Sequence, residues 1–203
     1  MQNIINGIRR YYPVSDASLA LLFSKMKKAE LPKKHLLIRG GVIDRHVYFI
    51  EKGFARSYCL LDGKELTIWF SREGDITFAM KDLYHNEPGY EYVELLEDST
   101  LYAISIEDLN QLYETNIEIA NWGRVIHQEC LLYMDQHHIS RLFLPAKERY
   151  LQLVRELPDV IQRAKLIYIA SYLGITPQHL SRLRAEKSVS YTHLRAHETL
   201  SDL

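Results

Sequence analysis

The pattern of apolar and polar residues changes near residue 105. Before that point, short runs rich in β-branched and aromatic residues alternate with glycine turns at regular spacing. Such a pattern is typical of an antiparallel sandwich or barrel rather than of helices. The runs are 47–50, 54–59 and 66–70, and the glycines are Gly41, Gly53, Gly63 and Gly74.

Two of these turns carry a more specific signal. Asp62-Gly63 lies between two apolar runs, and both residue types tolerate a positive φ, so a tight hairpin is expected there. Residues 73–75 predict the next corner. A helix is expected before the strands, over roughly residues 16–29, with Ser15 or Asp16 as its N-cap.

After about residue 106 the apolar positions follow a helical period. Residues 116–142 contain no proline and a single glycine, Gly123. They predict a helix about 40 Å long, which is longer than a small domain needs and is expected at an interface or between domains. A shorter helix, 146–157, is predicted between Pro145 and Pro158.

Residues 166–183 have the spacing of a helix-turn-helix. Ala170 supplies a small contact residue, Gly174 supplies a turn that tolerates a positive φ, and Thr176-Pro177 supplies an N-cap and first position for a second helix. The alternative is a plain helical hairpin within an interface. The residues expected in the shared core are Ile169, Leu173, Ile175, Leu180 and Leu183.

In a helix-turn-helix the second helix enters the DNA major groove. Gln pairs well with adenine and Arg with guanine, whereas Ser can bond a base or a phosphate. Charge agrees with this assignment, because residues 163–187 hold five basic residues and one acid, whereas residues 1–162 hold 19 basic and 23 acidic residues. The candidate DNA-binding residues are Thr176, Gln178, His179, Ser181, Arg182 and Arg184.

Strands, a long helix and a C-terminal helix-turn-helix together resemble the Crp–Fnr family of bacterial transcription regulators. Residues 48–58 resemble a β-roll hairpin of that family, residues 72–75 its turn into the phosphate-binding region, and residues 167–182 its DNA-reading unit. The resemblance implies an α+β fold with an N-terminal antiparallel β-roll of the double-stranded β-helix type. It also implies a long dimerisation helix, and Arg182 at the place of a base-contacting arginine.

One departure from the family concerns the effector. Members that bind cyclic nucleotides hold the phosphate with an arginine and backbone donors. The corresponding residues here, 88–94, contain no arginine but two carboxylates, Glu91 and Glu94. We therefore expect no binding of cyclic AMP or GMP, and Lys81 is expected to be a solvated surface residue. The effector-binding residues, if any, cannot be named from the sequence.

The composition excludes several other classes of protein. The 203 residues carry a net charge of −1, which rules out a uniformly basic nucleic-acid coat. With only two cysteines, neither in a C-x-x-C pair, a disulfide framework, a zinc knuckle and a four-thiolate iron–sulfur cluster are excluded. No nucleotide-binding or nucleophile motif is present, and His137-His138 cannot chelate from one helical face. We expect no enzyme activity, no metal and no cofactor.

The expected domains are 1–105 for the β-roll with its N-terminal helix, 106–144 for the dimerisation helix and 145–188 for the DNA-binding domain. Residues 189–203 resemble a translated sequencing adapter and are expected to be non-native.

The sequence thus predicts a cytoplasmic, homodimeric, sequence-specific DNA-binding regulator with no membrane segment. Its expected partners are duplex DNA, a second copy of the chain, a small-molecule effector if one exists, and RNA polymerase as a further candidate. The alternative is a ligand-binding or protein-interaction β-roll whose helix-turn-helix does not function. The residues expected in the dimer seam are Ile119, Trp122, Ile126 and Tyr133.

Overall fold

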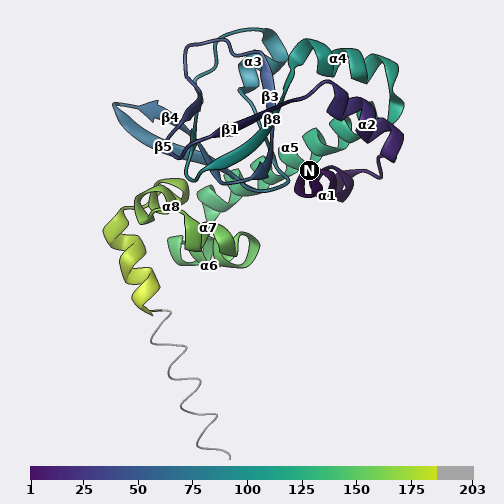
Figure 1. Cartoon of the computed structure of the whole chain (residues 1–203). Coiled ribbons are helices and arrows are strands. Elements are labelled where there is room, and N and C mark those ends of the chain that lie inside the picture. Colours follow the sequence, from purple (N-terminus) through teal and green to yellow (C-terminus); the bar gives the residue numbers. More distant parts are fainter. Residues whose placement is uncertain (187–203) are drawn as a thin grey trace, which may run out of the picture. The chain divides into compact units, whose positions relative to one another are not determined.

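The structure is a computed structural model that describes residues 1–186 (Figure 1). It divides into two compact units, and the boundary between Gln136 and His137 lies within a long helix. The expected non-native tail, residues 189–203, lies outside the described residues. Within residues 1–186, no helix combines the length and the apolar character that a membrane span requires.

Two antiparallel four-stranded sheets form the β-roll of the first unit. One sheet has the strand order β1-β8-β3-β6 and the other β2-β7-β4-β5. The strands are β1 (Lys27–Leu31), β2 (Leu36–Ile38), β3 (His46–Lys52), β4 (Ala55–Leu61), β5 (Lys64–Ser71), β6 (Ile76–Thr77), β7 (Tyr92–Leu95) and β8 (Ser99–Ser105).

The expected hairpin joins β4 to β5. Asp62 and Gly63 have φ values of 51° and 74°, which are the left-handed conformations of a tight two-residue turn. The neighbouring pair Leu61 and Lys64 closes the ladder. The corner at Gly74 also has a positive φ, 86°, and a Cβ at this residue would lie 2.9 Å from the carbonyl oxygen of Asn3. Both predicted turns are confirmed.

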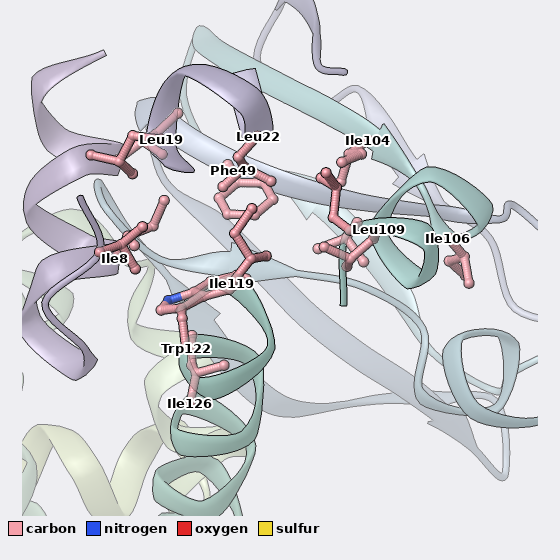
Figure 2. Close-up of a cluster of buried hydrophobic side chains, with 14 residues drawn as sticks. Ile8, Leu19, Leu22, Phe49, Ile104, Ile106, Leu109, Ile119, Trp122 and Ile126 are labelled. Carbon is pink, nitrogen blue, oxygen red and sulfur yellow. The ribbon is translucent and has the colours of Figure 1, made fainter. Parts of the chain in front are cut away.

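Alternate residues of β3 belong to two different apolar layers. Val47 and Phe49 pack against the helices of the first unit, whereas Ile50 packs with Val93 and Leu101 between the sheets. This alternation follows from the two-residue period of a strand. The sheet that contains β3 is therefore buried on both sides, and Figure 2 shows Phe49 within the helical layer.

Within residues 1–186, five helices accompany the β-roll, and two of them, α1 and α3, were not predicted. Helix α1 begins at Gln2, and the carboxylate of Glu51 accepts from the backbone N–H of Ile4 at 3.2 Å. Ile4 and Ile8 of α1 are buried in the helical layer. The helices are α1 (Gln2–Tyr11), α2 (Asp16–Ser24), α3 (Met80–His85), α4 (Ile106–Thr115) and α5 (Ile117–Phe143).

The predicted helix over residues 16–29 is wrong in its second half. Ser15 caps α2 as expected, since its side chain accepts from the N–H of Ser18 at 3.3 Å, but the helix ends at Ser24. Residues 27–31 instead form β1, which pairs with β8. Pairing with a distant strand outweighed the local helical pattern. This outcome cannot be predicted from the neighbouring residues, because it depends on β8.

Asn116 interrupts what the sequence presented as one helical region over 106–144. Its backbone is extended, with φ −135° and ψ 107°. Its side-chain oxygen accepts from the N–H groups of Glu118 and Ile119, each at 3.0 Å, and so caps α5. The long helix itself runs over 27 residues, Ile117–Phe143, close to the predicted 116–142.

The second unit contains the end of α5 and a group of short helices. Pro158 ends the preceding helix, as predicted. It also occupies the first position of a further helix, where its missing N–H has no cost because that N–H would have no partner within the helix. The helices are α6 (Ala146–Glu156), α7 (Pro158–Arg163) and α8 (Leu166–Leu173), followed by helical residues 177–186.

Three of the four residues predicted for the dimer seam are buried within one protomer. Ile119 and Trp122 are 0% and 1% exposed, and Ile126 is 9% exposed. Trp122 stacks on Phe49 with 5.7 Å between ring centroids, as Figure 2 shows. Tyr133 meets Trp69 of β5 edge-on at 4.7 Å. The predicted seam is therefore wrong for Ile119, Trp122 and Ile126, because this face of α5 completes the core of the first unit, whereas Tyr133 is half-buried and its place in a seam stays a prediction.

This assignment predicts different costs for two isoleucines at the start of α5. Ile119→Ala is expected to lower the free energy of unfolding by about 2–5 kcal/mol, because it leaves a cavity beside Trp122. Ile117→Ala is expected to change it by less than about 0.5 kcal/mol, because Ile117 is 74% exposed. Urea unfolding followed by circular dichroism measures both. Equal effects of the two substitutions would contradict the buried face described here.

Candidate nucleic-acid interface

The turn of the predicted helix-turn-helix has the backbone geometry that its sequence requires. Gly174 follows α8 with φ 66° and ψ 37°, in the left-handed region. Its N–H donates to Ser171 at 3.1 Å, and the N–H of Ile175 donates to Ala170 at 3.0 Å. This pair of bonds satisfies two carbonyls that the end of a helix leaves open.

The second helix begins where the sequence predicted. The hydroxyl of Thr176 accepts from the backbone N–H of His179 at 3.2 Å, and the carbonyl of Thr176 accepts from Leu180 at 3.0 Å. Pro177 is the first helical residue. Thr176 is thus a helix cap and sets where this second helix begins. Because the sequence predicts that this helix contacts DNA, it is called the recognition helix below.

The inner faces of the two helices share a core with α6 and α7. Ile175 is half-buried, and the remaining predicted core residues are buried. Ala170 is fully buried, as a small contact residue between crossing helices should be. The buried apolar residues of this unit are Tyr150, Leu153, Val160, Ile169, Ala170, Tyr172, Leu173, Leu180 and Leu183.

Gln178, Ser181 and Arg182 lie together on the exposed face of the recognition helix. Their spacing of three and four residues places them on one side of a helix. They line an open, shallow hollow together with Leu166 and Pro177. Of the predicted set, these three are the residues that the structure brings together at one surface.

The other three predicted residues have different surroundings. Thr176 is exposed at the cap, and His179 is half-buried. Arg184 is half-buried as well, and its guanidinium donates to the carbonyl of Ile161 in α7 at 3.5 Å. Arg184 therefore does not project from the helix in the manner of Arg182, although the sequence assigned both to one outward set.

Arg149 of α6 supports the motif and was not singled out in the sequence. Its guanidinium donates to the carbonyls of Leu144 at 2.7 Å and Leu173 at 3.0 Å, so it joins the residue after α5 to the end of α8. Burial, followed by the nearby charge of Arg141, lowers the pKa of Arg149, but an arginine remains a cation at neutral pH. An arginine within an amphipathic helix gives no sequence signal for such a role.

Charge around the motif is basic at the surface. Lys165 precedes α8, is exposed, and lies 5.4 Å from the centre of the Tyr168 ring. Glu186, the one acid within residues 163–187, lies 3.4 Å from the ammonium of Lys147. Both partners of that pair are exposed, so it stabilises little, but it places a cation against the one acid of the segment.

In the β-roll, a buried carboxylate lies at the start of α3. Glu91 is 4% exposed, and one of its oxygens accepts from the N–H of Met80, the first residue of α3, at 3.4 Å. A Cβ on Gly89 would lie 2.4 Å from the other oxygen. The carboxylate thus packs closely against the neighbouring backbone of its own chain.

Two cationic groups near this segment have anionic partners. Arg56 of β4 lies opposite Glu94 in the β4–β7 register, and its guanidinium is 3.0 Å from that carboxylate and 2.5 Å from Glu65. Lys81 is exposed and lies 3.8 Å from Glu87, which agrees with the predicted surface role. The structure therefore adds a buried arginine that the sequence analysis did not consider, and it is paired with two acids.

Histidines of α5 pack against other rings. The Nδ1 atom of His127 lies 2.7 Å from the carbonyl oxygen of Gly123, and its ring contacts Phe78 and Tyr84 edge-on. His137 stacks on Tyr172 with 4.6 Å between centroids, and burial lowers its pKa. Within residues 1–186, no group of three side chains is placed to hold a metal ion.

Comparison with known proteins identifies the class to which this arrangement corresponds. Residues 28–116, from β1 to the end of α4, match the cyclic nucleotide-binding domain family. No match was found among curated protein sequences.

Solved structures of Crp–Fnr regulators share the fold over most of their length. The c-di-GMP-responsive global regulator CLP of Xanthomonas campestris has a TM-score of 0.70 at 16% identity, covering 87% of this chain and 93% of that one. A Crp/Fnr-family transcriptional regulator from Eubacterium rectale has a TM-score of 0.67 at 15% identity, covering 89% and 88%. The catabolite activator protein of Thermus thermophilus scores 0.58 at 17% identity, covering 89% and 86%.

These likenesses confirm the predicted α+β fold: an antiparallel β-roll, a long helix and a C-terminal helical unit. The resemblance to the Crp–Fnr regulators is confirmed as well, because the chain has the fold of these regulators.

Proposed function

We propose that this chain is a sequence-specific DNA-binding transcription regulator that acts as a homodimer. The observation that carries the proposal is the exposed face formed by Gln178, Ser181 and Arg182 on a capped second helix. These side chains are suited to hydrogen bonding with base edges, and a helix of this kind fits the major groove. The basic residues of 163–187 add attraction for phosphates.

The competing interpretation is a β-roll binding module whose helix-turn-helix does not function. It would be favoured by a recognition face that is buried or neutralised by acids. Gln178 and Arg182 are exposed, which supports the regulator, whereas Arg184 is turned toward α7 and contributes less to that face.

Binding of a random duplex DNA pool by the full chain tests the proposal. The wild type is expected to enrich particular sequences, and Arg182→Ala is expected to weaken binding to the enriched site about 5- to 150-fold, because a guanine contact is lost. Arg155→Ala removes an exposed arginine of α6 and serves as the control of equal charge. It is expected to leave the preference unchanged.

A wild type that binds DNA without sequence enrichment would contradict a specific regulator. Equal losses in Arg182→Ala and Arg155→Ala would contradict the assignment of the recognition face. Binding is measured at several salt concentrations, because only the phosphate contribution falls steeply with salt.

Dimer formation is proposed through the exposed side of α5 rather than through the buried residues first expected. Five apolar side chains there are between 47% and 75% exposed. At 100° per residue they lie within an arc of about 120°, on the side of the helix roughly opposite to Ile119 and Trp122. Pairing of two such stripes would remove this apolar surface from water. The stripe consists of Leu131, Leu132, Ile139, Leu142 and Phe143.

Two substitutions on α5 distinguish this stripe from other exposed positions. Ile139→Glu places a charge at the centre of the stripe and is expected to give a monomer at concentrations where the wild type is a dimer. Met134→Glu is the control, because Met134 is 42% exposed but lies outside the arc. Light scattering during gel filtration measures the molar mass. A monomeric wild type, or a dimeric Ile139→Glu variant, would contradict the proposed seam.

We also propose that the β-roll does not respond to cyclic AMP or GMP. A cyclic phosphate at α3 would meet the carboxylate of Glu91 in a buried site, where repulsion between anions is strong.

Addition of either cyclic nucleotide at about 1 mM is therefore expected to leave the melting temperature unchanged, since a ligand that binds the native state raises it. Differential scanning fluorimetry measures the shift, with isothermal calorimetry as the direct check. Saturable binding of either nucleotide by the wild type would refute the expectation.

A further inference from the structure

The hollow beside the second helix of the motif is lined in part by apolar side chains. It is lined by Leu166 and Pro177, the first residues of the two helices, and by Gln178, Ser181 and Arg182. The Leu166 side chain is apolar, and proline has no backbone N–H to donate. The polar side chains of the lining all belong to the other three residues, which are exposed.

The side chains of Leu166 and Pro177 can bond neither a phosphate nor the polar edge of a base. The side chains near the motif that can donate to a phosphate are those of Lys165 and Arg182. In the major groove, the one apolar group on a base edge is the C5-methyl of thymine. An apolar recess between side chains suited to adenine and guanine matches that group in both chemistry and place.

We infer that Leu166 and Pro177 receive the methyl group of a thymine, in a base pair adjacent to those contacted by Gln178 and Arg182. This inference rests on the proposed DNA-binding function and adds a specificity-determining contact from α8, the first helix of the motif. Leu166 then acts with the recognition helix, since both line the same hollow. Each operator half-site contains one such thymine.

The test removes the methyl group without changing base pairing. The operator enriched by the full-length wild type is synthesised with deoxyuridine in place of each thymine in turn. At one thymine in each half-site, the substitution is expected to weaken binding about 4-fold, the effect of one buried methyl-sized group. The remaining thymines are expected to tolerate it.

Two variants then assign the effect to the hollow. Leu166→Ala is expected to abolish most of the difference between the thymine and deoxyuridine operators while retaining sequence-selective binding. Ile167→Ala is the matched control, because Ile167 is the neighbouring residue, is 57% exposed and does not line the hollow. It is expected to keep the 4-fold difference.

The outcomes separate this inference from the proposed function. Absence of any sequence-enriched binding by the wild type would refute the regulator proposal itself. Enriched binding with no thymine in the half-site, or with no loss at any deoxyuridine, would refute the methyl contact alone. A thymine preference that Leu166→Ala retains in full would show that another residue reads the methyl group, and would overturn the inference.

Discussion

The burial of one side of α5 in the β-roll core is the constraint on which much of the molecule depends. Ile119 and Trp122 fill the space between β3 and the other helices of the first unit, so the rotation of α5 about its own axis is determined there. A helix has a constant 100° step per residue, so within the first unit this rotation decides which side of α5 is exposed. Leu131 and Leu132 lie on that exposed side.

The β-roll combines the architecture of a known domain family with carboxylates at α3 and around Arg56. The strands, their turns and the short helix α3 are those of the cyclic nucleotide-binding domain family, which residues 28–116 match. Strand pairing and the apolar layers require only suitable burial patterns, whereas binding of a phosphate requires particular charged side chains. Glu91 at α3 and Arg56 between two carboxylates differ from what an anionic ligand needs.

In the helix-turn-helix, some features follow from single residues and others depend on contacts with distant segments. The positive φ of Gly174, the Thr176 cap and the buried Ala170 were all predicted, because each depends on the conformational preference or size of one residue. The direction of Arg184 was not predicted, because a long flexible side chain can reach either solvent or a neighbouring carbonyl. Its bond to Ile161 depends on α7, a helix that the sequence did not reveal.

The sequence by itself determined three of the strands, the long helix, two turns and the second helix of the helix-turn-helix, since period, glycine and capping residues act over a few neighbouring positions. Only the tertiary structure decided the rest. It assigned residues 27–31 to a strand by pairing them with β8, and it selected the buried side of α5 from a helix with apolar residues all round. It also brought Leu166 next to Pro177. These features depend on contacts between distant segments. Periodicity in the sequence identifies an apolar face, but it does not identify the segment that packs against that face.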